Sequence, residues 1–459
     1  MRFFPTLSCT VLALSAAATH AAVFTVTKTT DSLDGVCGTD CSLREAVVAA
    51  NATPGKSVIY LQADTYVLTL PAERAWDGES FDEDDNLNGD LDVSGTLKII
   101  GQGKDATIIS GSPEAYDRLF DVLPGAQLTL QKLRLTGGHT TFFGGALQNA
   151  GEAVLREVDV LDNEAVSRKY RGSGDLGFGG GIANFGNLAV YDSTLRDNNS
   201  DGRDIHVYIG GGGAIYNTAE LKVRGSTFSG NRATSSIFVD PDPWGIGGAI
   251  WNQGTASIGG STFIGNDSPG GVISNGPASG QMKIFNSTIS GNASQLGAVN
   301  NGVNPLSRHS PPPRTRLMQL VNVTIADNRF VGLVNNDVLL VRNSLIIGNS
   351  PAPSGQYLEC INNNQAEFTG LGVLIGSDSK GCVADLIVPS ANALSTVLYP
   401  LADNNGPTRT HALRPASPAL DAGLGSCAAL DQRGLARPRD GDGDGLAVCD
   451  LGAYERAAP

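Results

Sequence analysis

The chain has 459 residues and a formal net charge of −14 at pH 7, with 17% charged residues and only 6% aromatic residues. Such an acidic protein repels nucleic acid and anionic lipid and favours cations, so we expect no nucleic acid among its partners. Its 58 glycines, together with Val, Ile, Leu and Thr alternating with small polar residues, predict many short strands and tight turns.

The N-terminus has the pattern of a secretory signal peptide. Residues 1–22 place one Arg before an apolar run from about Leu7 to Ala18, and small residues follow. This run is too short to span a membrane. Cleavage after Ala21 or Ala22 predicts a protein that is secreted or held at the cell surface, without a transmembrane segment.

Six cysteines remain after the signal, and an even number in an exported chain predicts disulfides. Proximity in sequence pairs Cys37 with Cys41, Cys360 with Cys382, and Cys427 with Cys449. A zinc site is the alternative for the first pair, but neither a His nor a second Cys pair lies nearby.

Residues 23–56 are expected to form an N-terminal cap with one helix at 41–51, CSLREAVVAAN. Ser42 and Glu45 have the spacing of a capping box. The apolar stripe comprises Leu43, Ala46, Val47 and Ala50. An amphipathic helix placed before the first expected strand, 57–61, can cover the open end of a stack of strands.

A repeat then dominates the chain. Between Gly144 and Asn349, a small-residue patch ending in Asn and a strand ending in Asn recur seven times, as in GGAIWN followed by STFIGN. The first four of these segments have a constant length, whereas the connections between them vary, which is typical of a solenoid with insertions at one corner.

We therefore predict an all-β fold, a right-handed parallel β-helix over residues 57–390, with a loop-rich C-terminal cap at 391–459. The repeat places Phe228, Phe263 and Ile289 in one interior column. The Asn residues are expected to adopt left-handed turn conformations and to bond to the Asn of the next coil.

Three long connections must emerge side by side if the coils are in register, and each is polar with an aromatic residue. Aromatic platforms beside charged groups suit sugar binding. The candidate ligand-binding residues are Arg168, Lys169, Tyr170, Arg171, Arg203, Asp204, His206, Tyr208, Asp240, Asp242 and Trp244. The alternative is that these insertions are solvated decoration.

Two acidic, Gly-rich stretches have carboxylates or amides on alternate residues, the pattern of calcium loops. The C-terminal one offers Asp440, Asp442, Asp444 and Asp450, and the N-terminal one offers Asp84, Asn86, Asn88 and Asp90. Charged surface turns without a metal are the alternative for both stretches.

Three stretches of the chain resemble bacterial exported proteins with a CSLREA motif, often classed with the choice-of-anchor Q group. These stretches are CSLREAVVAAN, the later GDLDV, and the run LADNNGPTRTHAL…SPALDAG…DQRGLARP…DLGAYE. The resemblance implies a pectin-lyase-like right-handed β-helix at the cell surface or outside the cell. It implies no established reaction. The expected function is glycan or surface-partner binding through the stacked loops, and the alternative is a polysaccharide lyase or glycoside hydrolase acting on an acidic polysaccharide.

Overall fold

The computed structural model describes residues 21–72, 83–166, 168–170, 173–175, 177–202, 210–235, 245–276, 280–302, 316–349, 358–363 and 366–457. The predicted signal peptide therefore lies, except for its last two residues, outside the described residues. Among the residues described, no helix is long and apolar enough to span a membrane.

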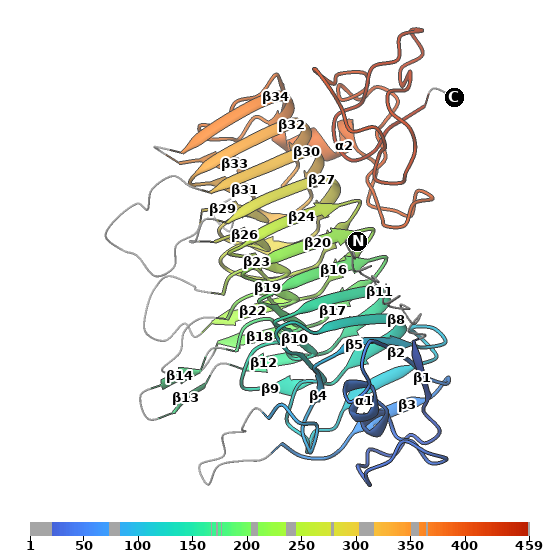
Figure 1. Cartoon of the computed structure of the whole chain (residues 1–459). Helices are drawn as coiled ribbons and strands as arrows, with labels where there is room; N and C mark the ends of the chain where they lie inside the picture. Colours follow the sequence, from blue (N-terminus) through green and yellow to red (C-terminus); the bar gives the residue numbers. More distant parts are fainter. Residues whose placement is uncertain are drawn as a thin grey trace, which may run out of the picture.

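The protein is a right-handed parallel β-helix, as predicted, with its coils stacked along one axis (Figure 1). The largest sheet has 18 strands. They are β1 (Ala22–Thr25), β2 (Lys56–Tyr60), β3 (Thr65–Leu68), β5 (Thr96–Ile100), β6 (Ile108–Gly111), β8 (Gln127–Thr136), β11 (Glu152–Leu161), β16 (Asn187–Tyr191), β17 (Thr194–Arg196), β20 (Glu220–Arg224), β21 (Thr227–Ser229), β24 (Thr255–Gly259), β25 (Thr262–Ile264), β27 (Gln281–Ser290), β30 (Leu317–Ala326), β32 (Val338–Ile347), β34 (Glu367–Gly376) and β35 (Leu386–Val388).

A second sheet of 11 strands forms another face. Its strands are β4 (Leu91–Val93), β7 (Phe120–Val122), β10 (Leu147–Asn149), β15 (Ile182–Asn184), β19 (Ile215–Asn217), β23 (Ile250–Asn252), β26 (Ile273–Asn275), β28 (Ala293–Ser294), β29 (Val299–Asn301), β31 (Arg329–Asn335) and β33 (Leu358–Asn362). A small parallel sheet contains β9 (His139–Thr140), β12 (Glu164–Val166), β18 (Asn199–Gly202) and β22 (Arg232–Ser235), and β13 (Arg168–Tyr170) pairs antiparallel with β14 (Ser173–Asp175).

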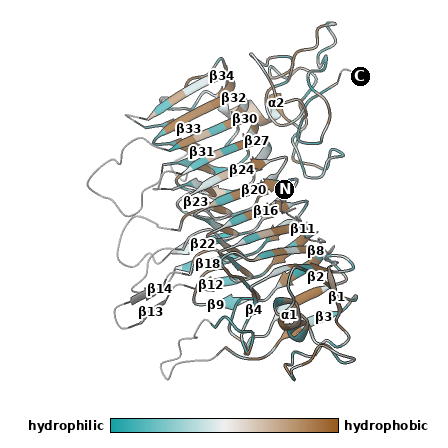
Figure 2. Cartoon of the chain, in the orientation of Figure 1, coloured by the Kyte–Doolittle hydropathy of each residue, from teal (hydrophilic) through white to brown (hydrophobic). Residues whose placement is uncertain are grey.

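The predicted interior column is confirmed. Phe228 pairs in register with Phe263, and Phe263 pairs with Ile289. The two Phe rings stack with centroids 4.6 Å apart, and all three side chains are fully buried. Hydrophobic and hydrophilic residues alternate along the strands, which directs one set of side chains to the interior (Figure 2).

Two ladders of asparagine side chains run along the stack. In the first, Nδ2 of each Asn donates to Oδ1 of the Asn in the next coil at 2.8–3.0 Å. Its members are Asn163, Asn198, Asn231, Asn266, Asn292, Asn328 and Asn349. In the second, the corresponding distances are 2.6–3.0 Å, along Asn149, Asn184, Asn217, Asn252, Asn275, Asn301, Asn335 and Asn362.

The expected bonding between coils is therefore confirmed, but the expected left-handed conformation of these Asn residues is wrong. Positive φ occurs at the residue before each Asn of the first ladder, such as Asp162, Asp197 and Gly230. The turn bends at this preceding residue, so the Asn itself keeps an ordinary backbone conformation and directs its amide along the axis.

The N-terminal helix α1 (Leu43–Asn51) covers the end of the stack beside β1 (Figure 1). Its capping box is present, because Ser42 Oγ accepts from the Glu45 backbone and the Glu45 side chain accepts from the Ser42 backbone. All four residues of the predicted apolar stripe are buried. The cap differs from expectation in one respect, since β1 pairs with β2 and the strand stack begins before the helix.

The three predicted disulfides are present, Cys37–Cys41, Cys360–Cys382 and Cys427–Cys449. After β35 the chain forms the short helices η1 (Ser390–Asn392) and α2 (Ala393–Val397) and then a loop-rich segment. This C-terminal segment, residues 398–457, lies along one side of the later coils (Figure 1). The Gln432 side-chain amide, for example, bonds to Thr262 and Thr288 on neighbouring strands.

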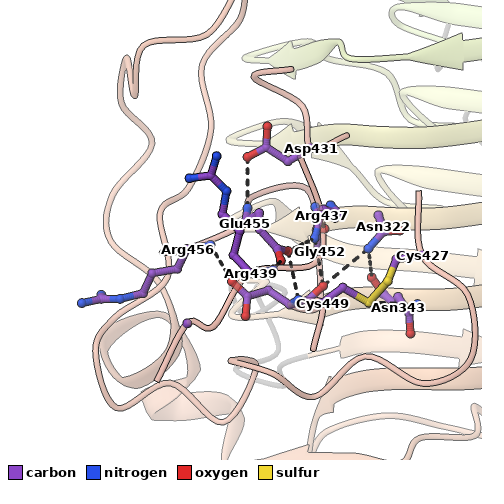
Figure 3. Close-up of polar contacts among 12 residues, drawn as sticks. Asn322, Asn343, Cys427, Asp431, Arg437, Arg439, Cys449, Gly452, Glu455 and Arg456 are labelled. Carbon is purple, nitrogen blue, oxygen red and sulfur yellow. Dashed lines mark hydrogen bonds and ion pairs between the residues drawn. A yellow bond between two sulfur atoms is a disulfide. The ribbon is translucent and has the colours of Figure 1, made fainter. Parts of the chain in front are cut away.

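A buried ion pair lies at the centre of this segment (Figure 3). Arg437 Nη1 donates to Glu455 Oε2 at 2.6 Å, and both side chains are fully buried. Arg437 also donates to the carbonyls of Asp450 and Gly452, at 3.1 and 2.8 Å. The Glu455 carboxylate in turn accepts the backbone N–H of Asp450.

His411 attaches the same segment to the β-helix. Its Nδ1 lies 2.8 Å from the Tyr399 carbonyl and its Nε2 lies 2.8 Å from Ser290 Oγ. Because a carbonyl can only accept, Nδ1 carries the proton and Nε2 accepts from the Ser290 hydroxyl. Burial lowers the pKa of His411, although the Tyr399 carbonyl and the charge of Asp327 oppose the shift.

We expect acidification to weaken the docking of this segment. A histidine whose pKa is lowered by folding stabilises the native state above its unfolded pKa of about 6.5, and this stabilisation is lost as the pH falls through the folded value. Melting temperatures between pH 7.5 and pH 5 should decline in the wild type, and the decline should be shallower in H411Q. Parallel profiles would contradict a role for His411.

Candidate functional site

The roots of the three long insertions stack, as predicted. Val166 pairs with Asp201 and Asp201 with Thr234 where the insertions leave the coils. On the return, Phe178 pairs with Gly211 and Gly211 with Ile246. The insertions therefore begin and end at equivalent positions of successive coils.

The predicted ligand-binding residues themselves remain untested. Eight of them lie outside the described residues: Arg171, Arg203, Asp204, His206, Tyr208, Asp240, Asp242 and Trp244. Arg168, Lys169 and Tyr170 form β13, which is described by its backbone alone.

An aromatic cluster that sequence reasoning missed lies at the return of the insertions. It contains Phe143, Phe178, Tyr216 and Trp251, and Phe185 packs at its edge. The sequence signal for this cluster is the aromatic middle residue of the three-residue strands β19 and β23. Tyr216 and Trp251 alternate with core residues and therefore point outward. Trp251 as a residue is 3% exposed, so the cluster contributes mainly to packing.

A groove lies on the outer face of the 18-stranded sheet, across β11, β16, β20 and β24. It encloses about 540 Å³ and is lined by Glu152, Ala153, Val154, Asn187, Leu188, Ala189, Glu220, Leu221, Lys222, Arg224, Thr255 and Ser257. Small residues form its floor, since Ala189 and Ser257 flank Lys222 in register. Glu152, Asn187, Glu220 and Thr255 are aligned along one edge.

The other edge of the groove is basic and aromatic. Arg156, Tyr191 and Arg224 are aligned on successive strands. The Arg156 guanidinium lies 4.2 Å from the Tyr191 ring centre, and that of Arg224 lies 4.7 Å from the Phe285 ring centre. Glycine at 259 leaves room for the Phe285 ring, because a Cβ there would lie 2.3 Å from Phe285 Cζ. The Phe285 ring can therefore extend across that strand to Arg224.

The two exposed lysines of the groove face flank these rings. Lys222 Nζ lies 5.7 Å from the Tyr191 ring centre, and Lys283 Nζ lies 5.7 Å from that of Phe285. Lys222 and Lys283 belong to one column, separated by Ser257. In an acidic protein, this edge concentrates positive charge beside ring faces, a combination suited to carboxylate-bearing sugars.

The N-terminal acidic stretch is arranged differently from the predicted calcium loop. Asn86 is a structural residue, because its side chain exchanges two hydrogen bonds with the Asp92 backbone. Asp90 Oδ2 lies 3.6 Å from Arg118 Nε. The Asn88 and Asp90 carbonyls accept from Arg44 of helix α1. Of the four predicted ligands, Asp84 alone belongs to a group of carboxylates that could share a metal.

That group contains Asp84, Asp92 and Asp121. Burial raises the pKa of Asp92 to about 8, opposed by the hydrogen bond from Asn86 and reinforced by the charges of Glu83, Asp121 and Asp84. Burial and the charge of Asp117 likewise raise the pKa of Asp90, despite its proximity to Arg118. The region thus gathers more carboxyl groups than its arginines can pair with, and burial disfavours the ionised form of Asp90 and Asp92.

The C-terminal acidic loop also differs in detail. Asp440 and Asp442 form a cluster of carboxylates with Asp421, a residue that sequence reasoning missed. Neither Asp444 nor Asp450 belongs to this cluster. Asp450 is buried and accepts the backbone N–H groups of Asp421 and Arg456. Calcium at this loop stays a prediction, and the experiment below on the N-terminal group includes it.

No family model matches the chain, and no curated protein matches it. Among solved structures, it is similar to pectate lyase Pel9A, with 14% identity over 95% of this chain and 97% of that chain and a TM-score of 0.48. It is also similar to the A-module of the mannuronan C-5 epimerase AlgE6 of Azotobacter vinelandii, with 13% identity over 76% of this chain and 93% of that chain and a TM-score of 0.34. At these values neither similarity identifies an activity, and membership of the CSLREA proteins stays a prediction.

Proposed function

We propose that this protein is an exported β-helix that binds a linear acidic glycan along the groove of the 18-stranded sheet. The observation that carries the proposal is the basic and aromatic edge formed by Arg156, Tyr191, Arg224 and Phe285. Coils repeat at about 4.8 Å, so the edge offers contacts at regular intervals to an extended polymer.

The two edges of the groove suit the two sides of a uronate chain. Carboxylates of the glycan would face Lys222 and Arg224, while its hydroxyls would bond to Asn187, Glu220 and Thr255 on the opposite edge. Tyr191 and Phe285 would pack against the faces of the sugar rings. The three long insertions, with Tyr170, Tyr208 and Trp244, are proposed as a second contact surface, and calcium as a cofactor.

Reversing the charge of the groove tests this proposal. We expect K222E/K283E to weaken binding to polygalacturonate by on the order of tenfold at low ionic strength, because two attractive charges become repulsive. Both lysines are exposed and lie on strands that are otherwise unchanged, so the melting temperature should stay the same. Binding is measured by affinity electrophoresis or isothermal calorimetry.

K380E is a control for reversing a single charge elsewhere, because Lys380 is exposed and lies away from the groove, beyond β34. It should bind polygalacturonate as the wild type does, and neutral dextran should bind equally weakly to all three proteins. Equal affinities of K222E/K283E and K380E for polygalacturonate would refute the groove. A polysaccharide lyase or hydrolase stays the alternative, and unsaturated uronates or new reducing ends released from the polymer would favour it.

A further inference from the structure

Asp92 and Asp121 occupy paired positions on two neighbouring strands. In β4 and β7 the flanking residues Leu91, Val93, Phe120 and Val122 belong to the core. Because side chains alternate along a strand, both carboxylates point to the outer face of the 11-stranded sheet. They are nevertheless buried, with Asp92 0% and Asp121 3% exposed.

The spacing of three carboxylates fits one metal ion. One oxygen each of Asp84, Asp92 and Asp121 lies within 4.8 Å of the others. Calcium binds carboxylate oxygens at about 2.3–2.6 Å, so oxygens on opposite sides of one ion are at most about 5 Å apart. Asp84 is exposed and leaves a side of the group open to solvent.

A second observation points independently to a ligand. Asp92 Oδ2 accepts the Asn86 backbone N–H at 3.1 Å, but the fully buried Oδ1 accepts no hydrogen bond within the described part of the chain. A buried carboxylate oxygen without a donor or a cation is strongly unfavourable.

The nearby arginines do not meet this need. Arg118 lies against Asp90 and Asp121, and Arg44 binds Asp31 and four backbone carbonyls of the 86–90 loop. Among the described residues, neither Asp84 nor Asp92 has an ion-pair partner. A bound divalent cation would supply the missing positive charge.

We propose that Asp84, Asp92 and Asp121 bind one calcium ion, which joins the acidic loop before β4 to the first strands of the 11-stranded sheet. This site goes beyond the proposed glycan binding and does not depend on it. Arg44 holds the loop from helix α1, so the ion would be bound where the N-terminal cap meets the coils. Hard oxygen ligands on two strands and one loop favour calcium over softer metals.

The test compares wild type, D92N, D84N and D442N by calorimetric titration with calcium chloride after treatment with a chelator, and by thermal melts. The wild type should bind calcium and gain a few degrees in melting temperature at millimolar calcium. D92N and D84N should each bind one ion fewer per chain than the wild type. D442N, which alters the C-terminal loop, should retain this ion.

The melt without calcium separates a metal ligand from a purely structural carboxylate. If Asp92 is a metal ligand, D92N should be at least as stable as the wild type in chelator, because the substitution replaces a buried carboxyl that has no cationic partner among the described residues with an amide of the same shape. D84N covers the case in which D92N fails to fold, since Asp84 is exposed. An unchanged number of bound ions in D84N, or a wild type that binds none outside the C-terminal loop, would overturn the proposal.

Discussion

R437M is expected to destabilise the C-terminal segment by about 3–5 kcal/mol, the usual result of removing one partner of a buried ion pair. The Glu455 carboxylate would lose its cation while remaining fully buried. At the same time the Gly452 carbonyl would lose its Arg437 donor, and the Asp450 carbonyl would keep only the longer bond from Asn322. Hydrogen exchange across residues 398–457 should report this loss directly, because the segment can open without unfolding the coils.

Two further variants test whether the effect of R437M comes from the ion pair. In R439M the replaced guanidinium makes one exposed hydrogen bond, to the Ala436 carbonyl, so exchange should stay close to that of the wild type. The double variant R437M/E455L also removes the unpaired Glu455 charge and should recover part of the lost stability, although the backbone N–H groups of Asp450 and Arg439 lose their acceptor. If R437M exchanges no faster than R439M, the ion pair does not hold the segment in place.

R44A is expected to have an effect of similar size, about 3–5 kcal/mol, at the opposite end of the protein. Its guanidinium is fully buried and donates to both oxygens of Asp31, at 2.8 and 3.1 Å. It also donates to the Asn86, Asn88, Gly89 and Asp90 carbonyls. Removing it leaves a buried aspartate and a loop whose carbonyls have lost their donor.

R44K keeps the charge but lacks the planar fork that reaches both Asp31 and the loop, so it should be intermediate. Chemical denaturation measures the overall stability, and hydrogen exchange of residues 83–90 localises the change. Unaltered exchange of these residues in R44A would show that helix α1 does not organise the loop. Calcium affinity should fall in the same order, wild type, R44K, R44A, if Asp84 is a ligand.

The features that sequence predicted correctly are those with a local or strictly periodic signal. The capping box needs residues three apart, and the column of Phe228, Phe263 and Ile289 follows from a constant repeat length. The pairing of Asp92 with Asp121 could not be found in this way, because these early coils lie before the regular repeat and their register is not visible. Asp421 was missed because about twenty residues separate it from Asp440.

The groove could have been found from the repeat. Lys222 and Lys283 each lie between two core residues, in LKV and MKI. Each lies at the same distance in sequence before an Asn of the first ladder. Aligning the coils on that Asn places both lysines in one outward column. The aromatic edge is harder to foresee, since Phe285 reaches Arg224 across a glycine. The conformation of the long insertions has no periodic signal at all.

The asparagine ladders give the solenoid a direction along its axis. In both, each Asn–Asn hydrogen bond runs from Nδ2 in the earlier coil to Oδ1 in the later coil, so the side-chain amide dipoles point the same way along the axis. The first ladder ends on Glu359, whose carboxylate accepts from Asn349 Nδ2 at 2.8 Å and from the backbone N–H groups of Gly348 and Asn349. In all three of these hydrogen bonds the carboxyl group is the acceptor. Duplicated coils can therefore extend the first ladder ahead of Asn349, whereas Glu359 ends this ladder while β34 and β35 continue the sheet beyond it.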